Sequence, residues 1–184
     1  MEIEEKLNIF GYNQEWLDLG ILNIEILDAQ IKDYEETNHC CFEHYRYGAF
    51  TQWVFKTKSA TIEEIKAFIK LALSDPDQGM GGAAIIDLLR ATWLTDDQFK
   101  YISSISVLKE KFSKELDMTF IKREISKNYL LNEVFEKAML LKNSSIERRL
   151  LEHKGISEEQ VETLSKEGTG KKVRNIAAQL LRGK

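Results

Sequence analysis

The amino-acid sequence predicts an all-α protein, and three observations favour this fold class. Apolar residues recur at spacings of three and four along most of the chain, which is the period of a helix with one buried face. A single proline, Pro76, stands among 184 residues, so long helices can run without interruption. No segment shows a convincing period-two alternation of the kind typical of strands. Because domains commonly run to about 100–200 residues, we expect one all-helical domain over residues 1–184.

The N-terminal segment predicts two helices. The first carries an apolar stripe from Trp16 to Ile31, with Asn13 as its N-cap. The second lies over residues 39–57 and is rich in aromatic side chains. These aromatics occur on more than one face of the helix, which favours core packing and leaves open a partly exposed contact surface.

A third helix is predicted over residues 61–74. Thr61 and Glu64 form the capping-box pattern, in which the hydroxyl accepts from a first-turn amide and the carboxylate reaches back to the cap. Pro76 disfavours helical backbone for the residue before it, so this helix should end near Ser74.

Two more helices should follow the proline. The glycines between residues 79 and 82 are expected to loosen the backbone before a fourth helix that runs to about Trp93. Thr95 with Gln98 then repeats the capping pattern and opens a fifth.

The C-terminal half continues with helical segments separated by polar or glycine-containing turns. Ser144 with Glu147 is expected to cap one of them, and Gly155 to end it in the left-handed conformation. Ser157 with Gln160 is expected to cap the start of the next helix. In chain order the segments are 106–127, which fits one or two helices, 130–141, 144–155, 157 up to the turn at 168–170, and 171–182.

Two segments share a spacing of small and large apolar residues, each just after a glycine-containing turn. A small residue lets a neighbouring helix approach, and the large residue one turn later fills the space beside it. The matching positions are Met80, Ala84 and Leu88 in one copy, Val173, Ala177 and Leu181 in the other, and more loosely Val134, Ala138 and Lys142.

These segments resemble HEAT or armadillo-like repeats, with Asp75-Pro76-Asp77 similar to the turn between the two helices of a repeat. The resemblance implies antiparallel helix pairs stacked as a short right-handed solenoid, in which neighbouring pairs share a core. An irregular helical bundle is the alternative fold.

Composition narrows the setting of the protein. No stretch approaches the roughly 18 apolar residues of a membrane span, and the first residues lack the basic start and apolar run of a secretory signal. Adjacent Cys40 and Cys41 do not suit an extracellular disulfide framework, so we interpret them as free thiols. We therefore expect a cytoplasmic protein without contact with a membrane.

Charge is distributed unevenly along the chain. Residues 1–92 hold 16 acidic and 8 basic side chains, whereas residues 93–184 hold 14 acidic and 18 basic ones. The net charges of −8 and +4 could steer a charged partner. The candidate partner-binding residues are Asp28, Glu35 and Glu36 in the acidic region and Lys171, Lys172 and Arg174 near the basic C-terminus.

Two glycine motifs resemble phosphate-binding patterns. The spacing of Gly79, Gly81 and Ala84 fits a dinucleotide fingerprint, but that fingerprint needs a preceding strand, and an acidic turn precedes it here. The segment Gly168-Thr169-Gly170-Lys171 lacks the earlier glycine and the magnesium-holding hydroxyl of a phosphate loop. We interpret both motifs as turns and predict no cofactor.

Residues 39–44 gather chemistry-bearing side chains. On a helix His39 would face Glu43, and Cys40 would face His44, so either pair could share a metal ion. Zinc requires three or four ligands, which favours a partly buried helix whose cysteines pack as small apolar groups. We therefore predict no metal site.

Three functions follow from these patterns. The leading one is a non-catalytic protein-interaction module or scaffold, in one version an immunity or inhibitor-like protein whose acidic residues pair with a basic enzyme. The second is a nucleic-acid-binding HEAT-like protein, which would contact phosphates through Lys171, Lys172 and Arg174. The third is a metal- or thiol-dependent enzyme centred on residues 39–44.

Overall fold

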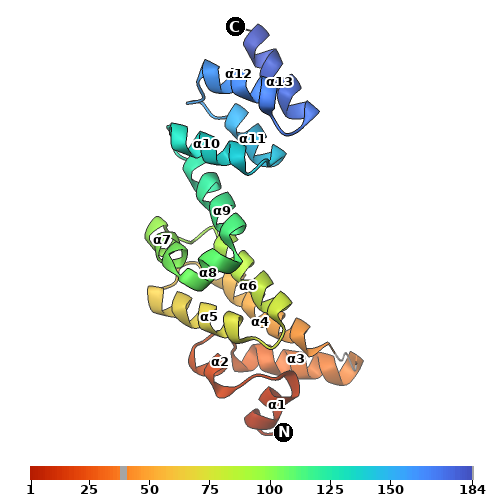
Figure 1. Cartoon of the computed structure of the whole chain (residues 1–184). Coiled ribbons are helices and arrows are strands. Elements are labelled where there is room, and N and C mark those ends of the chain that lie inside the picture. The colour runs from red at the N-terminus through yellow and green to blue at the C-terminus, as the bar shows by residue number, and fades with distance from the viewer. Residues whose placement is uncertain (38–40, 184) are drawn as a thin grey trace. The chain divides into compact units, whose positions relative to one another are not determined.

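The computed structural model describes residues 1–37 and 41–183, and Figure 1 shows the course of the chain. These residues form thirteen helices and no strand, which confirms the all-α prediction. The helices pack into two compact units, Met1–Ser104 and Ile105–Lys184, which we call unit 1 and unit 2.

Unit 1 is built around an aromatic core. Phe10, Phe50 and Phe68 are fully buried, and the Phe50 ring lies 5.0 Å from that of Phe68 and 4.5 Å from that of Trp16. Burial of such large side chains is the main favourable contribution to folding. The helices of the unit are α1 (Ile3–Phe10), α2 (Gln14–Asp18), α3 (Ile24–Thr37), α4 (Phe42–Lys56), α5 (Ile62–Ser74), α6 (Gln78–Arg90) and α7 (Asp96–Ser104).

The prediction of one helix through Trp16 and Ile31 was wrong, because the segment forms two helices, α2 and α3, with a non-helical connection between them. Gly20 adopts a φ of +69°, which a residue with a side chain rarely takes. The Asn23 side chain then accepts a hydrogen bond from the Ile26 amide at 2.9 Å and starts the second helix. Helix α1, which precedes both, was not predicted.

Helices α5 and α6 cross at very close range. A Cβ atom on Gly81 would lie 2.1 Å from the carbonyl oxygen of Ala72. The glycine is therefore required by the contact between the two helices. It lies inside α6 and not in a loosened turn before it, which corrects the expectation for the glycines between 79 and 82. Thr61 and Glu64 form the predicted capping box at the start of α5.

A buried ion pair holds α4 to the turn between α5 and α6. Arg46 donates from Nε and Nη2 to the two carboxylate oxygens of Asp75, at 2.9 and 3.1 Å, and from Nη1 to the Phe10 carbonyl at 2.8 Å. The Asp75 side chain is completely buried and also accepts from the Asp77 amide at 2.8 Å. The elements that surround this pair are therefore connected by charge-assisted hydrogen bonds.

A neutral network lies beside this pair. The Tyr12 hydroxyl lies 3.0 Å from the Gln30 side-chain oxygen and 2.8 Å from the Tyr45 carbonyl oxygen. Burial raises the pKa of Tyr12 well above its usual range, so the hydroxyl keeps its proton as a hydrogen-bond donor.

Unit 2 has an aliphatic core. Its buried residues include Ile121, Val134, Leu150, Leu164 and Val173, with Phe135 as the one buried aromatic of this cluster. The helices are α8 (Ser106–Lys111), α9 (Ser113–Ile125), α10 (Asn132–Leu140), α11 (Ser144–Leu151), α12 (Glu158–Glu167) and α13 (Lys171–Arg182), so that the segment 106–127 forms two helices.

The predicted cap of α11 was wrong. Asn143 is the N-cap and its side-chain oxygen accepts from the amides of Ser145 and Ile146, at 3.0 and 3.2 Å. Glu147 points into the unit instead of back to a cap. Gly155 does not have a left-handed backbone, and α11 ends earlier, at Leu151. The predicted capping pair of Ser157 and Gln160 does form, at the start of α12.

Three alanines of the spacing pattern are completely buried. Ala84 lies on α6, Ala138 on α10 and Ala177 on α13, and the side chain of each has no exposed surface. Their burial agrees with the expectation that small residues sit where helices approach one another.

Candidate functional site

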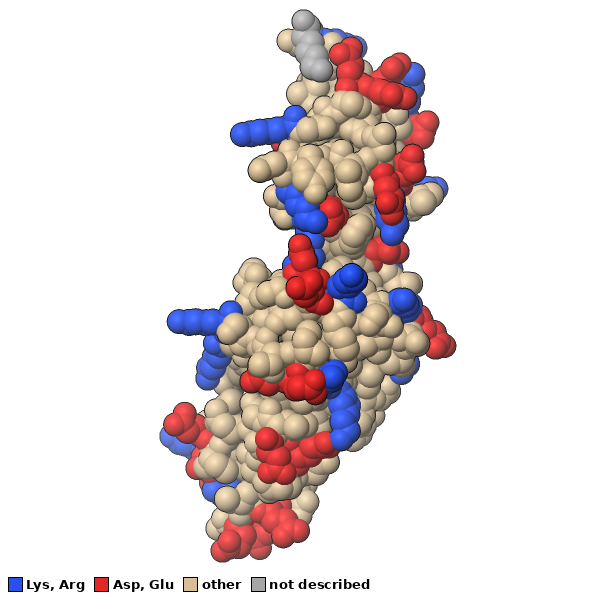
Figure 2. All heavy atoms as spheres, turned by 90° about the vertical axis from the view of Figure 1, so that its left-hand side faces the viewer, with Lys and Arg blue, Asp and Glu red and all other residues tan. Residues whose placement is uncertain are grey.

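The three acidic candidates lie on one side of α3. Asp28 forms a 2.5 Å ion pair with Lys6, and Glu36 lies 3.8 Å from Lys32. Glu35 is exposed and has no ion pair with the described residues. Figure 2 shows acidic side chains gathered at the N-terminal end of unit 1. Because two of the three candidates have lysine partners, the field of this stripe is weaker than the sequence suggested.

The three basic candidates lie on the first turns of α13, where they differ in exposure. Lys171 and Lys172 are exposed, whereas Arg174 is half-buried and donates from Nη1 to the Gly168 carbonyl at 2.6 Å. The acidic candidates belong to unit 1 and the basic ones belong to unit 2.

The segment with the predicted histidine and cysteine pairs is only partly described. His39 and Cys40 lie outside the described residues, so neither pair can be located. Glu43 and His44 lie in the first turn of α4, and Cys41 is its N-cap. The residues that the structure describes contain no group of three histidine, cysteine or acidic side chains that could hold a metal ion.

Both glycine motifs lie in connections between helices or inside a helix. Helix α5 precedes Gly79 and Gly81, so the strand of a dinucleotide fingerprint is missing. In the turn before α13, the Thr169 amide and hydroxyl donate to the two oxygens of Glu147, at 2.9 and 2.6 Å. The groups that would face a phosphate are therefore already bound to a carboxylate of the chain itself.

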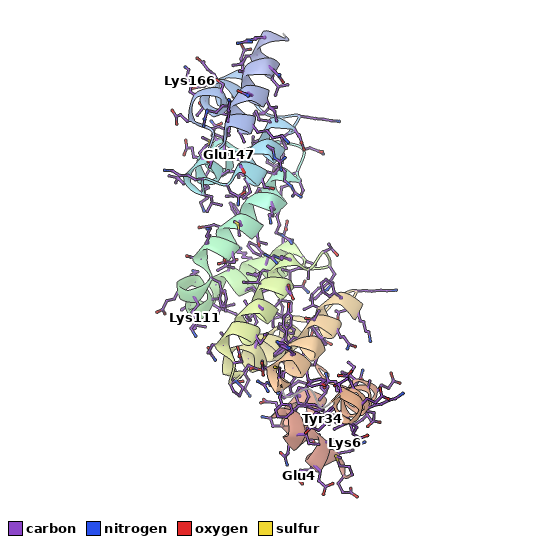
Figure 3. All side chains as sticks on the ribbon, turned by 90° about the vertical axis from the view of Figure 1, so that its right-hand side faces the viewer. Glu4, Lys6, Tyr34, Lys111, Glu147 and Lys166 are labelled. Atoms are coloured by element: carbon purple, nitrogen blue, oxygen red, sulfur yellow. The ribbon has the colours of Figure 1, made fainter. Side chains whose placement is uncertain are left out.

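Glu147 joins α11 to the turn before α13, whereas the sequence predicted that it would cap its own helix. It is completely buried on α11, and its side chain lies inside unit 2 in Figure 3. Its bond to the turn immediately before α13 places it near the positive end of a twelve-residue helix, which favours a negative charge. Its spacing after Ser144 suggested a local cap, and no sequence signal indicated the distant Thr169.

An open groove with a volume of about 790 Å³ lies on unit 2, between α10 and the turn that joins α12 to α13. Phe135, Met139 and Leu140 supply its apolar lining from α10. Arg174 lines it from α13, and Thr163 and Glu167 line it from α12. We call this hollow the C-terminal groove. It includes one of the six predicted partner-binding residues, Arg174.

The groove exposes apolar surface that a helix normally buries. Leu140 is 80% exposed although its neighbour Met139 packs partly against the core. Lys142, which follows α10, takes a left-handed φ of 47° and also lines the groove. In the sequence, these residues belong to an apolar stripe that is typical of core, so the stripe could not show which apolar residue stays outside.

The groove combines apolar surface with polar groups of both signs. Arg174 and Lys142 are basic, and Glu136 and Glu167 are acidic. The side chains offer hydrogen-bond donors and acceptors next to an apolar wall, which is the composition of a binding surface. Thr169 also lines the groove, where its hydroxyl donates to the Glu147 carboxylate at 2.6 Å and so ties the turn before α13 to α11.

No helix in the described part of the chain is long and apolar enough to cross a bilayer. Comparison of the sequence and structure with protein-family models, with curated proteins and with solved structures found no match.

Proposed function

We propose that the protein is a non-catalytic interaction module and that unit 2 binds a segment of a partner protein in the C-terminal groove. The observation that carries this proposal is Leu140, which is 80% exposed beside Met139 in a groove that Arg174 also lines. Burying a leucine side chain contributes about 1.5–3 kcal/mol, so a partner that covers it gains affinity there.

The partner segment is expected to carry a large apolar side chain next to a carboxylate. The apolar side chain would pack on Met139 and Leu140. The carboxylate would accept from the Arg174 guanidinium, whose planar fork binds carboxylates well and which donates to its own chain through Nη1. Unit 2 has 17 basic and 12 acidic residues, and this net charge of +5 also favours an acidic partner.

The wider setting of this module is part of the same proposal. The buried alanines of α6, α10 and α13 support a HEAT-like stacking of helix pairs in a right-handed solenoid. A cytoplasmic immunity or inhibitor-like protein is one version of such a module. For that version the acidic stripe of α3, with Glu35 exposed, would be a second contact surface toward a basic enzyme.

A displayed peptide library tests the groove with random segments in place of a chosen partner. The complete chain is immobilised and random peptides are selected on it. We expect enriched peptides to place a leucine, phenylalanine or tryptophan beside aspartate or glutamate. Leu140→Asp should abolish their binding, and Arg174→Gln should weaken it about tenfold because a charge-assisted hydrogen bond is lost.

Phe55→Asp is the matched control, because Phe55 is 75% exposed, belongs to unit 1 and does not line the groove. Peptide binding should survive this change. Peptides that bind the Leu140→Asp variant as well as they bind the unchanged chain would contradict the proposal.

Nucleic-acid binding is the second candidate, favoured by the exposure of Lys171 and Lys172 at the start of α13. A duplex oligonucleotide should then bind with an affinity that falls steeply as salt rises, because phosphate contacts release counterions. The double variant Lys171→Gln with Lys172→Gln should reduce this slope by about two. Absence of binding at about 50 mM salt would remove this candidate.

A further inference from the structure

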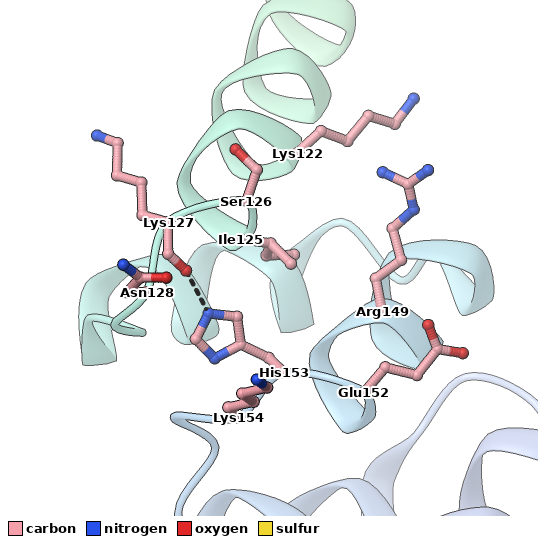
Figure 4. A pocket seen from close by; sticks show the side chains of 9 residues that line it. All are labelled: Lys122, Ile125, Ser126, Lys127, Asn128, Arg149, Glu152, His153 and Lys154. Atoms are coloured by element: carbon pink, nitrogen blue, oxygen red, sulfur yellow. Dashed lines mark hydrogen bonds between the residues drawn. The ribbon is translucent and has the colours of Figure 1, made fainter.

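A second hollow on unit 2, which we call the basic pocket, lies between the C-terminal ends of α9 and α11. It has a volume of about 300 Å³ and shares no residue with the C-terminal groove. Figure 4 shows Lys122 extending from α9 and Arg149 extending from α11 on the same side of the pocket. Lys154 lies in the loop after α11, so basic groups come from three separate places in the chain.

Basic side chains outnumber acidic ones around this pocket. Lys122, Arg149 and Lys154 form no ion pair with any residue that the structure describes. Lys127 differs, because it forms a 2.5 Å ion pair with Glu124. Glu152 is the one acidic side chain that lines the pocket. Four basic side chains, of which Lys127 is paired with Glu124, and one acidic side chain therefore line the pocket.

His153 forms a rigid wall of this pocket. The Gly155 amide donates to its Nδ1 at 2.9 Å, so Nδ1 carries no proton. The proton is therefore on Nε2, which donates to the Lys127 carbonyl at 2.8 Å, as the dashed line in Figure 4 marks. Both ring nitrogens are occupied by the backbone, which fixes the loop that carries Lys154 against the end of α9.

Some of the carbonyl groups at the ends of the two helices accept hydrogen bonds from the chain itself. Ser126 caps α9 by donating from its amide to Arg123 and Glu124, and its hydroxyl donates to Arg123 again at 2.6 Å. Glu152 caps α11 by donating from its amide to Arg148 and Leu150. These bonds satisfy carbonyl groups of the last turns of α9 and α11 within the chain.

We propose that the basic pocket binds the phosphate group of a small phosphomonoester. A phosphate dianion would accept from the Arg149 fork and from the ammonium groups of Lys122 and Lys154, which supply donors from separate directions. The volume admits a phosphate with a small organic remainder. This site is independent of the peptide groove, so either proposal can fail without the other.

The test is a titration of the complete chain, labelled with ¹⁵N, with glycerol 3-phosphate at constant ionic strength. We expect the amide signals of residues 122–128 and 149–155 to shift in a saturable way. Inorganic phosphate should shift the same signals. Glycerol, which lacks the phosphate, and sodium chloride at equal ionic strength should not. No saturable shift at 20 mM ester, or an equal response to chloride, would overturn the proposal.

Charge-removing variants locate the site. Arg149→Gln and Lys122→Gln should each weaken binding of the ester about tenfold, because each removes a charge-assisted hydrogen bond. Lys114→Gln is the matched control, since Lys114 is exposed on α9 and does not line the pocket. All three positions are exposed, so the variants should keep the circular dichroism spectrum of the unchanged chain. Equal weakening by Lys114→Gln would mean diffuse attraction and would overturn the assignment.

A final arm separates small phosphate esters from the phosphodiester backbone of nucleic acids. A short duplex oligonucleotide is titrated under the same conditions. If it binds through Arg149 while glycerol 3-phosphate does not bind, the pocket belongs to a nucleic-acid surface and the proposal is wrong. If the ester binds and the duplex does not displace it, the proposal stands.

Discussion

Unit 1 and unit 2 each bury a carboxylate, and they satisfy it in opposite ways. In unit 1, the Asp75 carboxylate pairs with the positively charged guanidinium of Arg46 and accepts two hydrogen bonds from it. In unit 2, the Glu147 carboxylate accepts hydrogen bonds from two neutral donors, the amide and the hydroxyl of Thr169 near the start of α13. A buried charge thus needs donors in the right geometry, and the donors need not be a cation.

The cores of the two units also differ in the kind of side chain that they bury. The core of unit 1 contains phenylalanine, tyrosine and tryptophan rings in mutual contact, whereas the core of unit 2 is mostly aliphatic. The two hollows described above both lie on unit 2, which also carries the positive net charge. Unit 1 thus buries aromatic rings and an ion pair, whereas unit 2 buries mostly aliphatic side chains and carries both hollows.

The largest expected effect is loss of the ion pair in unit 1. Asp75→Ala should lower the free energy of unfolding by about 3–5 kcal/mol, because it leaves the Arg46 guanidinium buried without its counter-charge. Urea unfolding followed by circular dichroism measures this loss. The double variant Arg46→Met with Asp75→Ala should be less destabilised than Asp75→Ala alone, since no buried charge is left. A double variant with the summed loss of the two single variants would contradict coupling of the pair.

The second largest effect concerns the close contact between α5 and α6 in unit 1. Gly81→Ala should destabilise by about 1–3 kcal/mol, because the added methyl group would overlap the Ala72 carbonyl. Gly48→Ala is the control, since its Cβ would meet nothing within 4 Å inside α4. It should raise stability by about 0.5–1 kcal/mol, as expected for glycine in a helix. Thermal unfolding of both variants gives the two signs directly.

The buried carboxylate of unit 2 should be less sensitive than that of unit 1. Glu147→Gln keeps one acceptor oxygen for Thr169 and loses the other, so we expect a loss of about 1–2 kcal/mol. Urea unfolding under the conditions used for Asp75→Ala gives the comparison. A loss equal to that of Asp75→Ala would mean that the charge of Glu147 itself stabilises unit 2 and would refute the contrast between the units.

The capping boxes allow a matched comparison of helix starts. Thr61→Ala in α5 and Ser157→Ala in α12 should each cost about 1 kcal/mol, because each removes the side chain that accepts from the third residue of its helix. Native-state hydrogen exchange should show faster exchange of the Glu64 amide in one variant and of the Gln160 amide in the other. Unchanged exchange at these amides would exclude the caps as local stabilisers.

The smallest effect is a difference in acid sensitivity between the two boxes. Hydrogen bonds from the backbone and side chain of Thr61 lower the pKa of Glu64 below its ordinary 4.5. Its contribution to stability is therefore present above pH 4.5 and is lost as the pH falls through the lowered pKa. The box of α12 uses uncharged Gln160 and has no such dependence. Exchange at the start of α5, but not of α12, should accelerate between neutral pH and pH 3, after correction for the intrinsic rate.

Local signals in the sequence predicted the helices well where side chains act on their own neighbours. Thr61, Thr95 and Ser157 each pair with a residue three positions later, and each begins a helix as expected. Pro76 ends α5 within two residues, as its effect on the preceding backbone requires. The helix period also indicated that Ala84 and Ala177 are buried.

Contacts between distant residues could not be predicted in this way. Arg46 and Asp75 are 29 positions apart, and Glu147 and Thr169 are 22 apart, so neither pair leaves a local pattern. The break at Gly20 was hidden because the apolar spacing continues across it. For the candidate site, charge pointed to Arg174, but only the packing of α10 reveals that Leu140 lies outside the core.

The hydrogen bonds between Glu147 and Thr169 have a consequence for the order in which unit 2 folds while the chain is being synthesised. The carboxylate belongs to α11, but the amide that binds it leaves the ribosome 22 residues later. Until then the side chain must remain hydrated, and α11 cannot turn its inner face permanently away from water. Completion of this half of the molecule therefore waits until the hairpin of α12 and α13 has emerged and closes over the acid.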